Sequence, residues 1–387
     1  MLVHAPTSPR TIAGENVFIY SWFIGWPTLE WSLIFQQNKN VFIFGKNRSG
    51  GENHLTNRIT IREVAKEANV SIATVSKALN GVDVVRPATK ERVMAAAQRL
   101  HYVPNLMGKQ LKNTKTKMLG FYTTSIKGPY FSVLVEAIAR EAEKHGYAVN
   151  VFLSADKRVV LNSILGGVVD GIIGFEDFLT KQDLAAMERE QIKAVFIDRN
   201  IQEKNFGSVV FDSFEKGKAA TEYLLSLGHK KIAFISGITG VYDSDERLRG
   251  YLEALNEAGV SKRSDYQLQG FFEEERTRVR VQQFLLEQKD LPTAFLAGND
   301  LSAIGTVKAI HETKWRVPDD FSVIGFDGID LLDYFMPRLT TVKNPIQLQG
   351  VTAVKHLIEM IEENAIGISY VLSGELCINQ STKQANE

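Results

Sequence analysis

The stretch Thr60-Ile-Arg-Glu-Val-Ala-Lys-Glu-Ala-Asn-Val-Ser-Ile-Ala-Thr-Val-Ser-Lys-Ala-Leu-Asn80 decides how the N-terminal part of this 387-residue chain folds. Apolar residues recur in it at helical spacing, at Val64, Ala65, Ala68, Val75 and Leu79. Asn69 tolerates the left-handed backbone of a sharp turn, and Ser71 is a favourable helix N-cap. The pattern therefore predicts two short helices joined by a tight turn.

The second helix has an exposed side with small and basic residues, which are Ile72, Ala73, Ser76 and Lys77. A short helix of this kind fits the major groove of DNA, which is about 12 Å wide. A third helix is expected from Pro87 to Leu100, because Pro is favoured in a first helical turn. Three helices can bury a small core. A three-helix bundle without a DNA-binding role is the alternative interpretation.

Positive charge is concentrated in and after these helices. Residues 58–117 contain 12 Lys and Arg against 4 Asp and Glu, a net charge of +8, whereas residues 118–387 contain 29 against 38, a net charge of −9. A basic block beside an acidic body is typical of a nucleic-acid-binding module joined to another domain. The last part of the block, residues 105–117, has too little apolar surface to fold alone. It is either a disordered linker or a hinge that becomes helical on DNA.

The stretch from Thr60 to Leu111 resembles the DNA-binding region of the LacI/GalR family of repressors. The resemblance rests on Val-Ala-x-x-Ala-x-Val-Ser-x-x-Thr-Val-Ser-x-x-Leu-Asn, followed by Tyr-x-Pro-Asn and a basic hinge that contains leucine. It implies that Ile72, Ala73 and Lys77 read bases. It implies phosphate or backbone contacts for Ser71, Thr74, Ser76, Asn80 and Asn105. Leu111 matches a leucine that family members insert into the minor groove, where an apolar wedge unstacks a base step and bends the duplex.

The chain departs from this family pattern in two places. Gly108 replaces the usual Ala, which weakens a hinge helix by about 1 kcal/mol. Ile72 and Ala73 offer apolar contacts where other members have hydrogen-bonding side chains. The operator preferences of the family therefore do not carry over to this chain.

Residues 1–57 differ from the rest of the chain. They contain three of its four tryptophans, and the apolar run from Val17 to Phe35 is interrupted by Pro27 and Glu30. A membrane-spanning helix needs about 20 apolar residues with few charges, so a membrane anchor is the weaker interpretation. Members of the family begin within a few residues of the helix-turn-helix motif. We interpret residues 1–57 as an extension that is disordered or that results from an upstream start codon.

From Met118 onward, apolar runs alternate with amphipathic helices, as in parallel sheets. The predicted strands are Leu119–Ser125, Ala148–Leu153, Asp170–Phe175, Ala194–Asp198, Ser208–Phe211, Ile232–Ser236, Thr293–Leu296 and Val323–Phe326. This length is large for one sheet, so we expect an α/β fold with two lobes. The predicted domains are the extension (1–57), a three-helix helix-turn-helix head (58–104), a hinge helix or linker (105–117) and an effector-binding and dimerisation domain (118–387).

Polar and aromatic residues follow several of these strands, and ligands of such sheets bind at the carboxyl ends of strands. The candidate effector-binding residues are Ser125, Tyr130, Phe131, Asp198, Arg247, Asn299 and Asp327. Planar polar groups beside an aromatic face suit a sugar. Aspartates in these places can instead cap the helices that follow, and for Asp212 and Asp300 the two interpretations stand equal.

The family resemblance continues from Leu119 to about Thr382 and implies a periplasmic-binding-protein-like domain. Its signatures include Arg247-Leu-Arg-Gly-Tyr251, Ile324-Gly-Phe-Asp327 and Gln380-Ser-Thr382. It implies hydrogen bonds to the effector from the positions of Arg247, Asn299 and Asp327. It also places Asp198 in the same cleft, with Tyr130 and Phe131 in a loop that packs against it.

The prediction that follows is a sugar-responsive transcriptional repressor that binds a palindromic operator in double-stranded DNA as a homodimer. The single Cys377 suits a reducing cytosol, so we expect a cytoplasmic protein with no role at a membrane. A sugar phosphate or a nucleobase stays open as the effector, and so does a protein corepressor.

Two other classes of function fit the sequence less well. A periplasmic-type sugar-binding protein of a transport system predicts a secretory signal and no helix-turn-helix. An enzyme lacks support, because the chain has no phosphate-binding Gly-x-x-x-x-Gly-Lys-Ser/Thr loop, no Gly-x-Ser-x-Gly elbow and no His-Glu-x-x-His. We therefore expect no catalytic residues, no cofactor and no metal site.

Overall fold

The computed structural model describes residues 59–79, 84–102, 115–175 and 179–386, and the backbone of four strands between residues 10 and 45. The chain divides into two compact units, Met1–Leu106 and Met107–Glu387. The four N-terminal strands pair antiparallel in sequence order and are β1 (Arg10–Ile12), β2 (Glu15–Trp22), β3 (Trp31–Phe35) and β4 (Phe42–Gly45). These four strands lie in residues 1–57, which the sequence suggested to be disordered. The interpretation of residues 1–57 as an extension stays a prediction.

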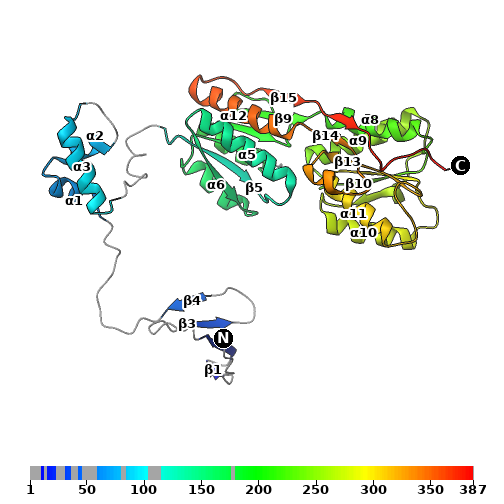
Figure 1. Cartoon of the computed structure of the whole chain (residues 1–387), viewed down its shortest axis with the longest axis horizontal. Helices are drawn as coiled ribbons and strands as arrows, with labels where there is room; N and C mark the ends of the chain where they lie inside the picture. Colours follow the sequence, from blue (N-terminus) through cyan, green and yellow to red (C-terminus); the bar gives the residue numbers. More distant parts are fainter. Residues whose placement is uncertain are drawn as a thin grey trace. The chain divides into compact units, whose positions relative to one another are not determined.

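The head consists of three helices, α1 (Ile61–Glu67), α2 (Ile72–Leu79) and α3 (Pro87–Arg99) (Figure 1). Their shared core includes Val64, Val75, Ala78, Val93 and Ala96. The turn between α1 and α2 follows the sequence argument, because Asn69 has φ 49° and the Ser71 hydroxyl accepts a 3.1 Å hydrogen bond from the Thr74 amide. The predicted helix-turn-helix is therefore present.

The first lobe of the second unit is a parallel sheet with strand order β15-β9-β8-β7-β5-β6. Its strands are β5 (Met118–Thr123), β6 (Ala148–Leu153), β7 (Gly171–Phe175), β8 (Ala194–Ile197), β9 (Phe206–Phe211) and β15 (Ser369–Leu372). One face is covered by α5 (Pro129–Lys144) and α12 (Ile346–Glu362), and the other by α6 (Lys157–Leu165) and α7 (Lys181–Arg189). The central strands are buried on both faces, which explains their continuous apolar sequences.

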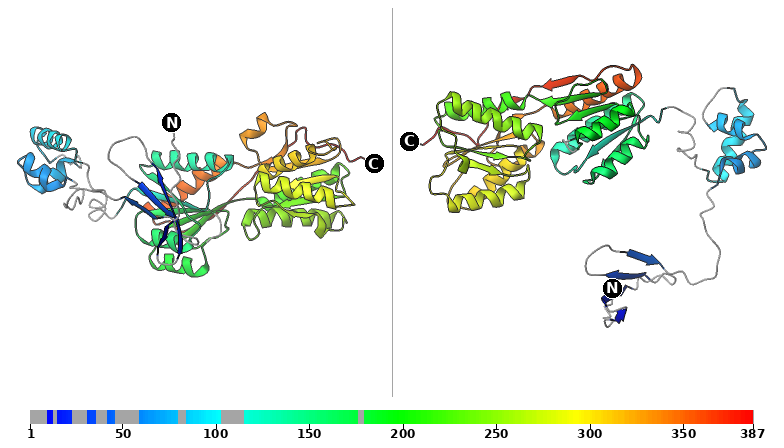
Figure 2. Two further views of the ribbon diagram at one scale, coloured as in Figure 1. Left: turned by 90° about the horizontal axis from the view of Figure 1, so that it is seen from below. Right: turned by 180° about the vertical axis from the view of Figure 1, so that it is seen from behind.

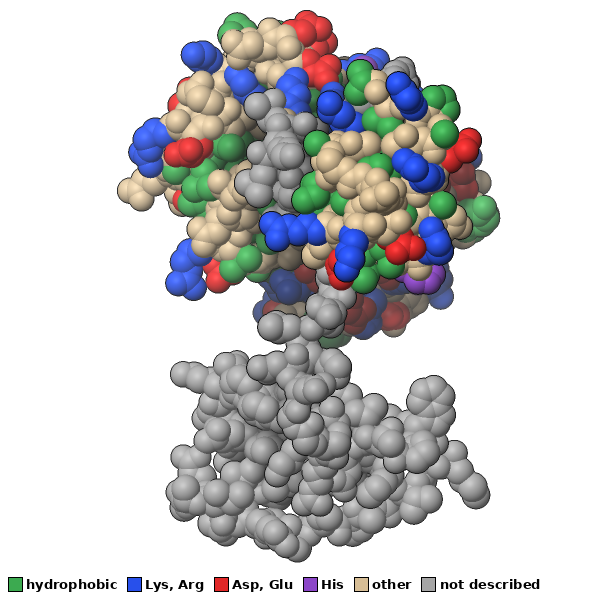
Figure 3. All heavy atoms as spheres, turned by 90° about the vertical axis from the view of Figure 1, so that its left-hand side faces the viewer, with side chains coloured by type: hydrophobic (Ala, Val, Ile, Leu, Met, Phe, Trp, Pro, Cys, Tyr) green, Lys and Arg blue, Asp and Glu red, His purple; other side chains and the backbone are tan. Residues whose placement is uncertain are grey.

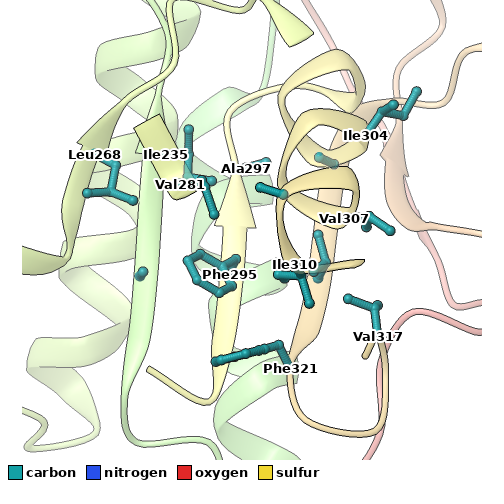
Figure 4. Close-up of a cluster of buried hydrophobic side chains, with 14 of the residues drawn as sticks. Ile235, Leu268, Val281, Phe295, Ala297, Ile304, Val307, Ile310, Val317 and Phe321 are labelled. Carbon is teal, nitrogen blue, oxygen red and sulfur yellow. The ribbon is translucent and has the colours of Figure 1, made fainter. Parts of the chain in front are cut away.

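The second lobe has strand order β11-β10-β12-β13-β14-β16. Its strands are β10 (Ile232–Ser236), β11 (Gln267–Gln269), β12 (Ala294–Ala297), β13 (Ser322–Asp327), β14 (Thr340–Lys343) and β16 (Glu375–Cys377). One face is covered by α8 (Ser213–Ser226) and α9 (Tyr242–Glu257), and the other by α10 (Glu274–Glu287) and α11 (Asp300–His311). Figure 4 shows the core under α11, where Phe295 and Phe321 lie beside Val307 and Ile310.

These two sheets confirm the predicted α/β fold of two lobes, and Figure 2 shows both lobes from two further sides. The eight predicted strands lie within two residues of the observed ones at either end. The sequence did not predict β11, β14, β15 or β16, and β16 runs antiparallel to β14. The chain also crosses between the lobes three times, after β9, after β14 and between β15 and β16. No helix in the described ranges is long and apolar enough to cross a membrane.

Candidate DNA-binding surface and effector cavity

The surface of α2 carries the residues predicted to contact DNA. Ile72 is 45% exposed although it is apolar, and Ala73 and Lys77 are also exposed, while Val75 and Ala78 on the opposite side are buried. Thr74 and Ser76 are half-buried, and the Thr74 hydroxyl lies 2.8 Å from that of Ser71. Figure 3 views the chain from the left-hand side of Figure 1 and shows Lys and Arg side chains spread among the other side chains on that side of the molecule.

Three of the predicted DNA contacts, Asn80, Asn105 and Leu111, lie outside the described residues. The hinge helix lies there too. Their roles, and those of the residues on α2, stay predictions that rest on the exposure of this helix face and on the family motif.

The candidate effector site is a cavity of about 610 Å³ between the two lobes. The structure brings all seven candidate effector-binding residues to its wall: Ser125, Tyr130, Phe131, Asp198, Arg247, Asn299 and Asp327. The first four come from the first lobe and the other three from the second. Their contact with an effector stays a prediction, but their convergence follows from the carboxyl ends of two facing sheets.

Arg247 is the central cation of the cavity wall, and it is only 3% exposed. Its Nη1 donates a 2.5 Å hydrogen bond to the carbonyl of Gly298, and its Nη2 donates to Asp243 Oδ2 at 3.3 Å. Nη1 also lies 3.7 Å from Asp327 Oδ1, and the guanidinium lies 4.7 Å from the centre of the Phe326 ring. Nε is also buried and has no hydrogen-bond partner. Because a guanidinium has five N–H donors, Arg247 keeps hydrogen-bonding capacity beyond its bonds to Gly298 and Asp243.

Buried carboxylates surround this guanidinium. Burial raises the pKa of Asp243, and it raises the pKa of Asp327 well above the ordinary value. Asp198 Oδ1 accepts a 2.9 Å hydrogen bond from the Asp243 amide, which ties the end of β8 in the first lobe to the start of α9 in the second. Asp198 and Asp327 both have positive φ, 66° and 107°, at the ends of their strands. Such strained backbone is typical of functional sites.

Aromatic side chains line both sides of the cavity. On the first lobe, the Phe131 and Phe175 rings are 4.9 Å apart, and the Tyr130 hydroxyl donates a 2.6 Å hydrogen bond to Gln349 Oε1. Burial raises the pKa of Tyr130 well above the ordinary value. On the second lobe, Phe271 and Phe272 lie in a turn where both have positive φ, 59° and 62°. A flat ligand ring can therefore meet aromatic faces contributed by either lobe.

Among the polar residues that follow β12, Asn299 caps the next helix and Asp300 does not. The Asn299 side chain caps α11 through the Ser302 amide at 2.9 Å and donates to the Phe272 carbonyl at 3.1 Å. Asp300 does not line the cavity, and it accepts hydrogen bonds from the Gly328 and Ile329 amides at 2.7 and 3.0 Å. Burial raises the pKa of Asp300 to about 7.

Asp212 also lies away from the cavity wall. It accepts hydrogen bonds from the Ser373 hydroxyl at 2.6 Å and from the Gly374 amide at 3.2 Å. Asp212 and Asp300 therefore neither line the cavity nor cap the helix that follows them, and their side chains instead bind distant segments of the chain.

Sequence reasoning left several wall residues out of the candidate set, namely Lys127, Phe175, Phe271, Phe272 and Glu273 to Glu275. Phe175 ends a predicted strand, so the rule that placed Asp198 would also have found it. Phe271 and Phe272 follow β11, a three-residue strand that gives no periodic signal. Within the described ranges, no group of three His, Cys, Asp or Glu is arranged to hold a metal ion.

Comparisons with known proteins agree with this arrangement. Residues 60–105 match the family described as bacterial regulatory proteins, lacI family, and residues 221–382 match the periplasmic binding protein-like domain. The HTH-type transcriptional repressor PurR of Aliivibrio salmonicida is 33% identical over 309 residues, which are 79% of this chain and 92% of that protein. The PurR repressor of Erwinia tasmaniensis is 36% identical over 308 residues, 78% of this chain and 90% of that protein.

Two solved structures show the same fold. The lac repressor dimer bound to operator and the anti-inducer ONPF has a TM-score of 0.72 at 28% identity, covering 84% of this chain and 99% of that one. The complex of the transcriptional regulator CelR with cellobiose has a TM-score of 0.64 at 26% identity, covering 84% of this chain and 100% of that one.

The head and the cavity together define a two-part regulator, in which a helix-turn-helix module is joined to a periplasmic-binding-protein-like domain. The chain belongs to the lacI family of bacterial regulatory proteins. It is a DNA-binding transcriptional repressor, and members of this family bind operator DNA as dimers and respond to small molecules. The predicted family is confirmed, and so is the prediction that the chain is not an enzyme, because its relatives are repressors.

Proposed function

We propose that this repressor controls carbohydrate-utilisation genes and that a sugar in the cavity sets its affinity for a palindromic operator. The observation that carries the proposal is the cavity itself. Its volume of about 610 Å³ suits a small ligand, and its wall combines aromatic faces with convergent polar groups. The fold relative CelR was solved with cellobiose, which supports a sugar here.

The charge of the cavity wall favours an uncharged ligand. Three buried aspartates, Asp198, Asp243 and Asp327, face one buried cation, Arg247. The exposed Lys127 is a second cation of the wall, and Glu273, Glu274 and Glu275 form ion pairs with Arg276, Lys308 and Arg278. Carboxylates accept hydrogen bonds from sugar hydroxyls, whereas they repel a phosphate group. The sugar is therefore not phosphorylated.

A nucleobase is the second candidate effector. Aromatic residues of both lobes, Phe131 and Phe272 among them, line the cavity and suit a planar ring as well as a sugar ring. The carboxylates suit the N–H groups of a base as they suit hydroxyl groups. Binding data decide between these two ligand classes.

The switch that we propose links the cavity to the heads of a homodimer in the cytoplasm. Two heads contact two half-sites of the operator, so the half-sites repeat with the two-fold symmetry of the dimer. A ligand in the cavity changes how the two lobes of each protomer pack against each other. The linkers of the two protomers change position as a result. Coupling of this kind is typically about 1–3 kcal/mol and is reciprocal.

A thermal-shift screen tests the effector class. Unphosphorylated sugars, among them D-ribose and cellobiose, are compared with their phosphates and with nucleobases, and each hit is repeated on Asp327→Ala. We expect an unphosphorylated sugar to raise the Tm. In Asp327→Ala its Kd rises about 5-fold or more, because a buried hydrogen-bonding group that loses its partner costs about 1–3 kcal/mol. Asp330→Ala, an exposed aspartate nearby, is the matched control.

Two outcomes of the same screen would contradict the proposed effector class. A shift with sugar phosphates alone contradicts the charge argument, and a shift with nucleobases alone replaces the sugar with the second candidate. If each hit is also titrated against operator DNA without a second protein, a change in operator affinity shows that no corepressor is required.

A further inference from the structure

The chain enters the ligand-binding unit through one carboxylate. Asp170 Oδ1 accepts hydrogen bonds from the Thr116 amide and hydroxyl at 2.5 and 2.7 Å, and Asp170 Oδ2 accepts from the Lys117 amide at 2.9 Å. Asp170 also donates its own amide to the Met118 carbonyl at 2.8 Å. Three donors of the entering chain thus converge on one side chain, which lies 53 or 54 residues away in sequence.

Lys117, the residue just before β5, is also held by contacts of its carbonyl group and its side chain. It has φ 55°, a conformation that L residues rarely adopt, and its carbonyl accepts a 3.0 Å hydrogen bond from the Ala148 amide. Its Nζ lies 2.7 Å from Glu362 Oε1 and 4.2 Å from the centre of the Tyr147 ring. We call Thr116, Lys117, Asp170, Tyr147 and Glu362 the entry clamp.

The contributions within the entry clamp are unequal. Lys117 and Glu362 are about half exposed, with side chains 49% and 40% accessible, so solvent weakens their ion pair. The bonds to Asp170 involve two backbone amides and a half-buried hydroxyl, and they set the direction in which the chain enters β5. Asp170 is therefore the residue on which the geometry depends.

Three elements run from the entry clamp to the cavity. β5 starts after Lys117, and Ser125, just beyond its end, lies in the cavity wall. β7 starts directly after Asp170 and ends at Phe175, which also lines the cavity. The two strands are hydrogen-bonded neighbours.

The third element is α12, which ends at Glu362 of the entry clamp. In its first turn Gln349 accepts the hydrogen bond of Tyr130, a residue of the cavity wall. Close-packed interiors transmit small displacements because they do not compress. A shift of the cavity wall is therefore carried to the point where the linker from the head enters.

We infer that the entry clamp couples the effector cavity to the linker, with Asp170 and Thr116 as positioning residues for the regulation of DNA binding. The inference rests on the proposed function, because it assumes that a small molecule in the cavity alters operator affinity. It adds the residues through which the effect reaches the head. A purely structural role for Asp170 would affect folding but not the response to a small molecule.

The test uses the full-length chain and a duplex selected from a library of palindromes. Operator Kd is measured by fluorescence anisotropy with and without a probe, which is whichever of D-ribose, cellobiose and adenine changes the Kd of the unsubstituted chain most. The ratio of the two Kd values is the readout. Thr116→Val removes the hydroxyl at equal shape, Thr116→Ser keeps it, and Asp170→Asn removes one of the two carboxylate acceptors.

We expect the Kd ratio to fall about fivefold or more toward one in Thr116→Val and Asp170→Asn, given that allosteric factors are typically about 5–150. Thr116→Ser keeps the ratio. Asp290→Asn, which removes an equal charge from a surface ion pair with Lys231, also keeps it. Probe affinity by calorimetry and the Tm without probe stay close to those of the unsubstituted chain in the variants.

An unchanged ratio in both Thr116→Val and Asp170→Asn overturns the inference and leaves the proposed function intact, because the unsubstituted chain reports that function in the same titration. A ratio that falls only in step with lost probe affinity also overturns it. A ratio near one in the unsubstituted chain, with every probe, overturns the proposed function and the inference together.

Discussion

Neighbouring carboxylates of the second lobe have different partners and therefore different roles. Asp300 is fully buried and is bound by two backbone amides and by the Thr341 hydroxyl at 2.6 Å. Asp327 lies at the cavity wall near Arg247, with a donor-to-acceptor distance of 3.7 Å. Both follow or end a strand, so only their contacts separate a structural aspartate from a ligand-binding candidate.

The raised pKa of Asp300 predicts a pH-dependent stability. Its pKa rises from 3.8 to about 7 on folding, so the stability that its protonated form contributes is fully present below pH 3.8 and is lost as the pH rises through about 7. Asp300→Asn stays neutral, its oxygen can accept both amide bonds, and its amide can donate to Thr341. We expect the variant to match the unsubstituted chain in Tm near pH 4.5 and to exceed it near pH 8. A Tm difference that does not vary with pH contradicts this assignment.

Lys77 is the basic residue on the exposed face of α2, and its replacement tests the predicted base reading. We expect Lys77→Ala to reduce the preference for operator over random duplex by about 5–150-fold, which corresponds to about 1–3 kcal/mol for a good base contact. The measurement is anisotropy with both duplexes at one salt concentration. Lys90→Ala on α3 is the control, because Lys90 is also exposed on the head. Equal losses for both duplexes would make Lys77 a phosphate contact instead.

At the residue scale, sequence reasoning succeeded where a residue's place followed from strand ends. All seven candidates line one cavity, and Ser125, Asp198, Asn299 and Asp327 lie at or just beyond a strand end, whereas Tyr130, Phe131 and Arg247 lie in the helices that follow. It could not show that Arg247 is held by Gly298, because that contact depends on how α9 packs against the end of β12, whereas Asp243 lies one turn before Arg247 on α9 itself. Nor could it reveal the turn at Phe271 and Phe272, since nothing in the sequence marks two residues with positive φ there.

Three of the four strands that the sequence did not predict, β14, β15 and β16, adjoin the crossings between the lobes. β14, β15 and β16 are three or four residues long, and each pairs with a strand that is distant in sequence or runs beside a crossing between the lobes. Strands so short have no measurable periodicity. The long strands were predictable because strands buried on both faces have continuous apolar sequences. The amphipathic helices were predictable because burial of one face leaves apolar residues at helical spacing.

Asp212, just after β9, connects two of the three crossings between the lobes by hydrogen bonds. One is the crossing after β9, and the other is the crossing between β15 and β16. Asp212 bonds Ser373 and Gly374 between β15 and β16, and it lies 3.5 Å from Lys216 Nζ. We expect Asp212→Ala to destabilise this unit by about 1 kcal/mol, since a partly buried amide loses its acceptor, and to lower the Tm by a few degrees. Ser373→Ala loses one of these bonds and is expected to cost less. Unchanged melting in differential scanning calorimetry would show that the crossings hold without this aspartate.

At the scale of the whole molecule, positive charge and the cavity belong to different segments of the chain. Residues 58–117 carry a net charge of +8, and residues 118–387 carry −9 and form the cavity. The family, the fold and the location of the cavity were predictable from motifs and strand ends. The identity of the effector was not, because it depends on the shape of a wall built from two lobes.

Operator titration over a range of salt concentrations, with and without the sugar found in the screen, tests the account most directly. We expect tight, salt-sensitive binding to a palindromic duplex, with log Kd rising linearly with log salt as phosphate contacts release counterions. The sugar shifts the whole line by about 5–150-fold. Binding that shows no preference for any palindrome, or that is the same at every sugar concentration, would contradict control of DNA binding by the cavity.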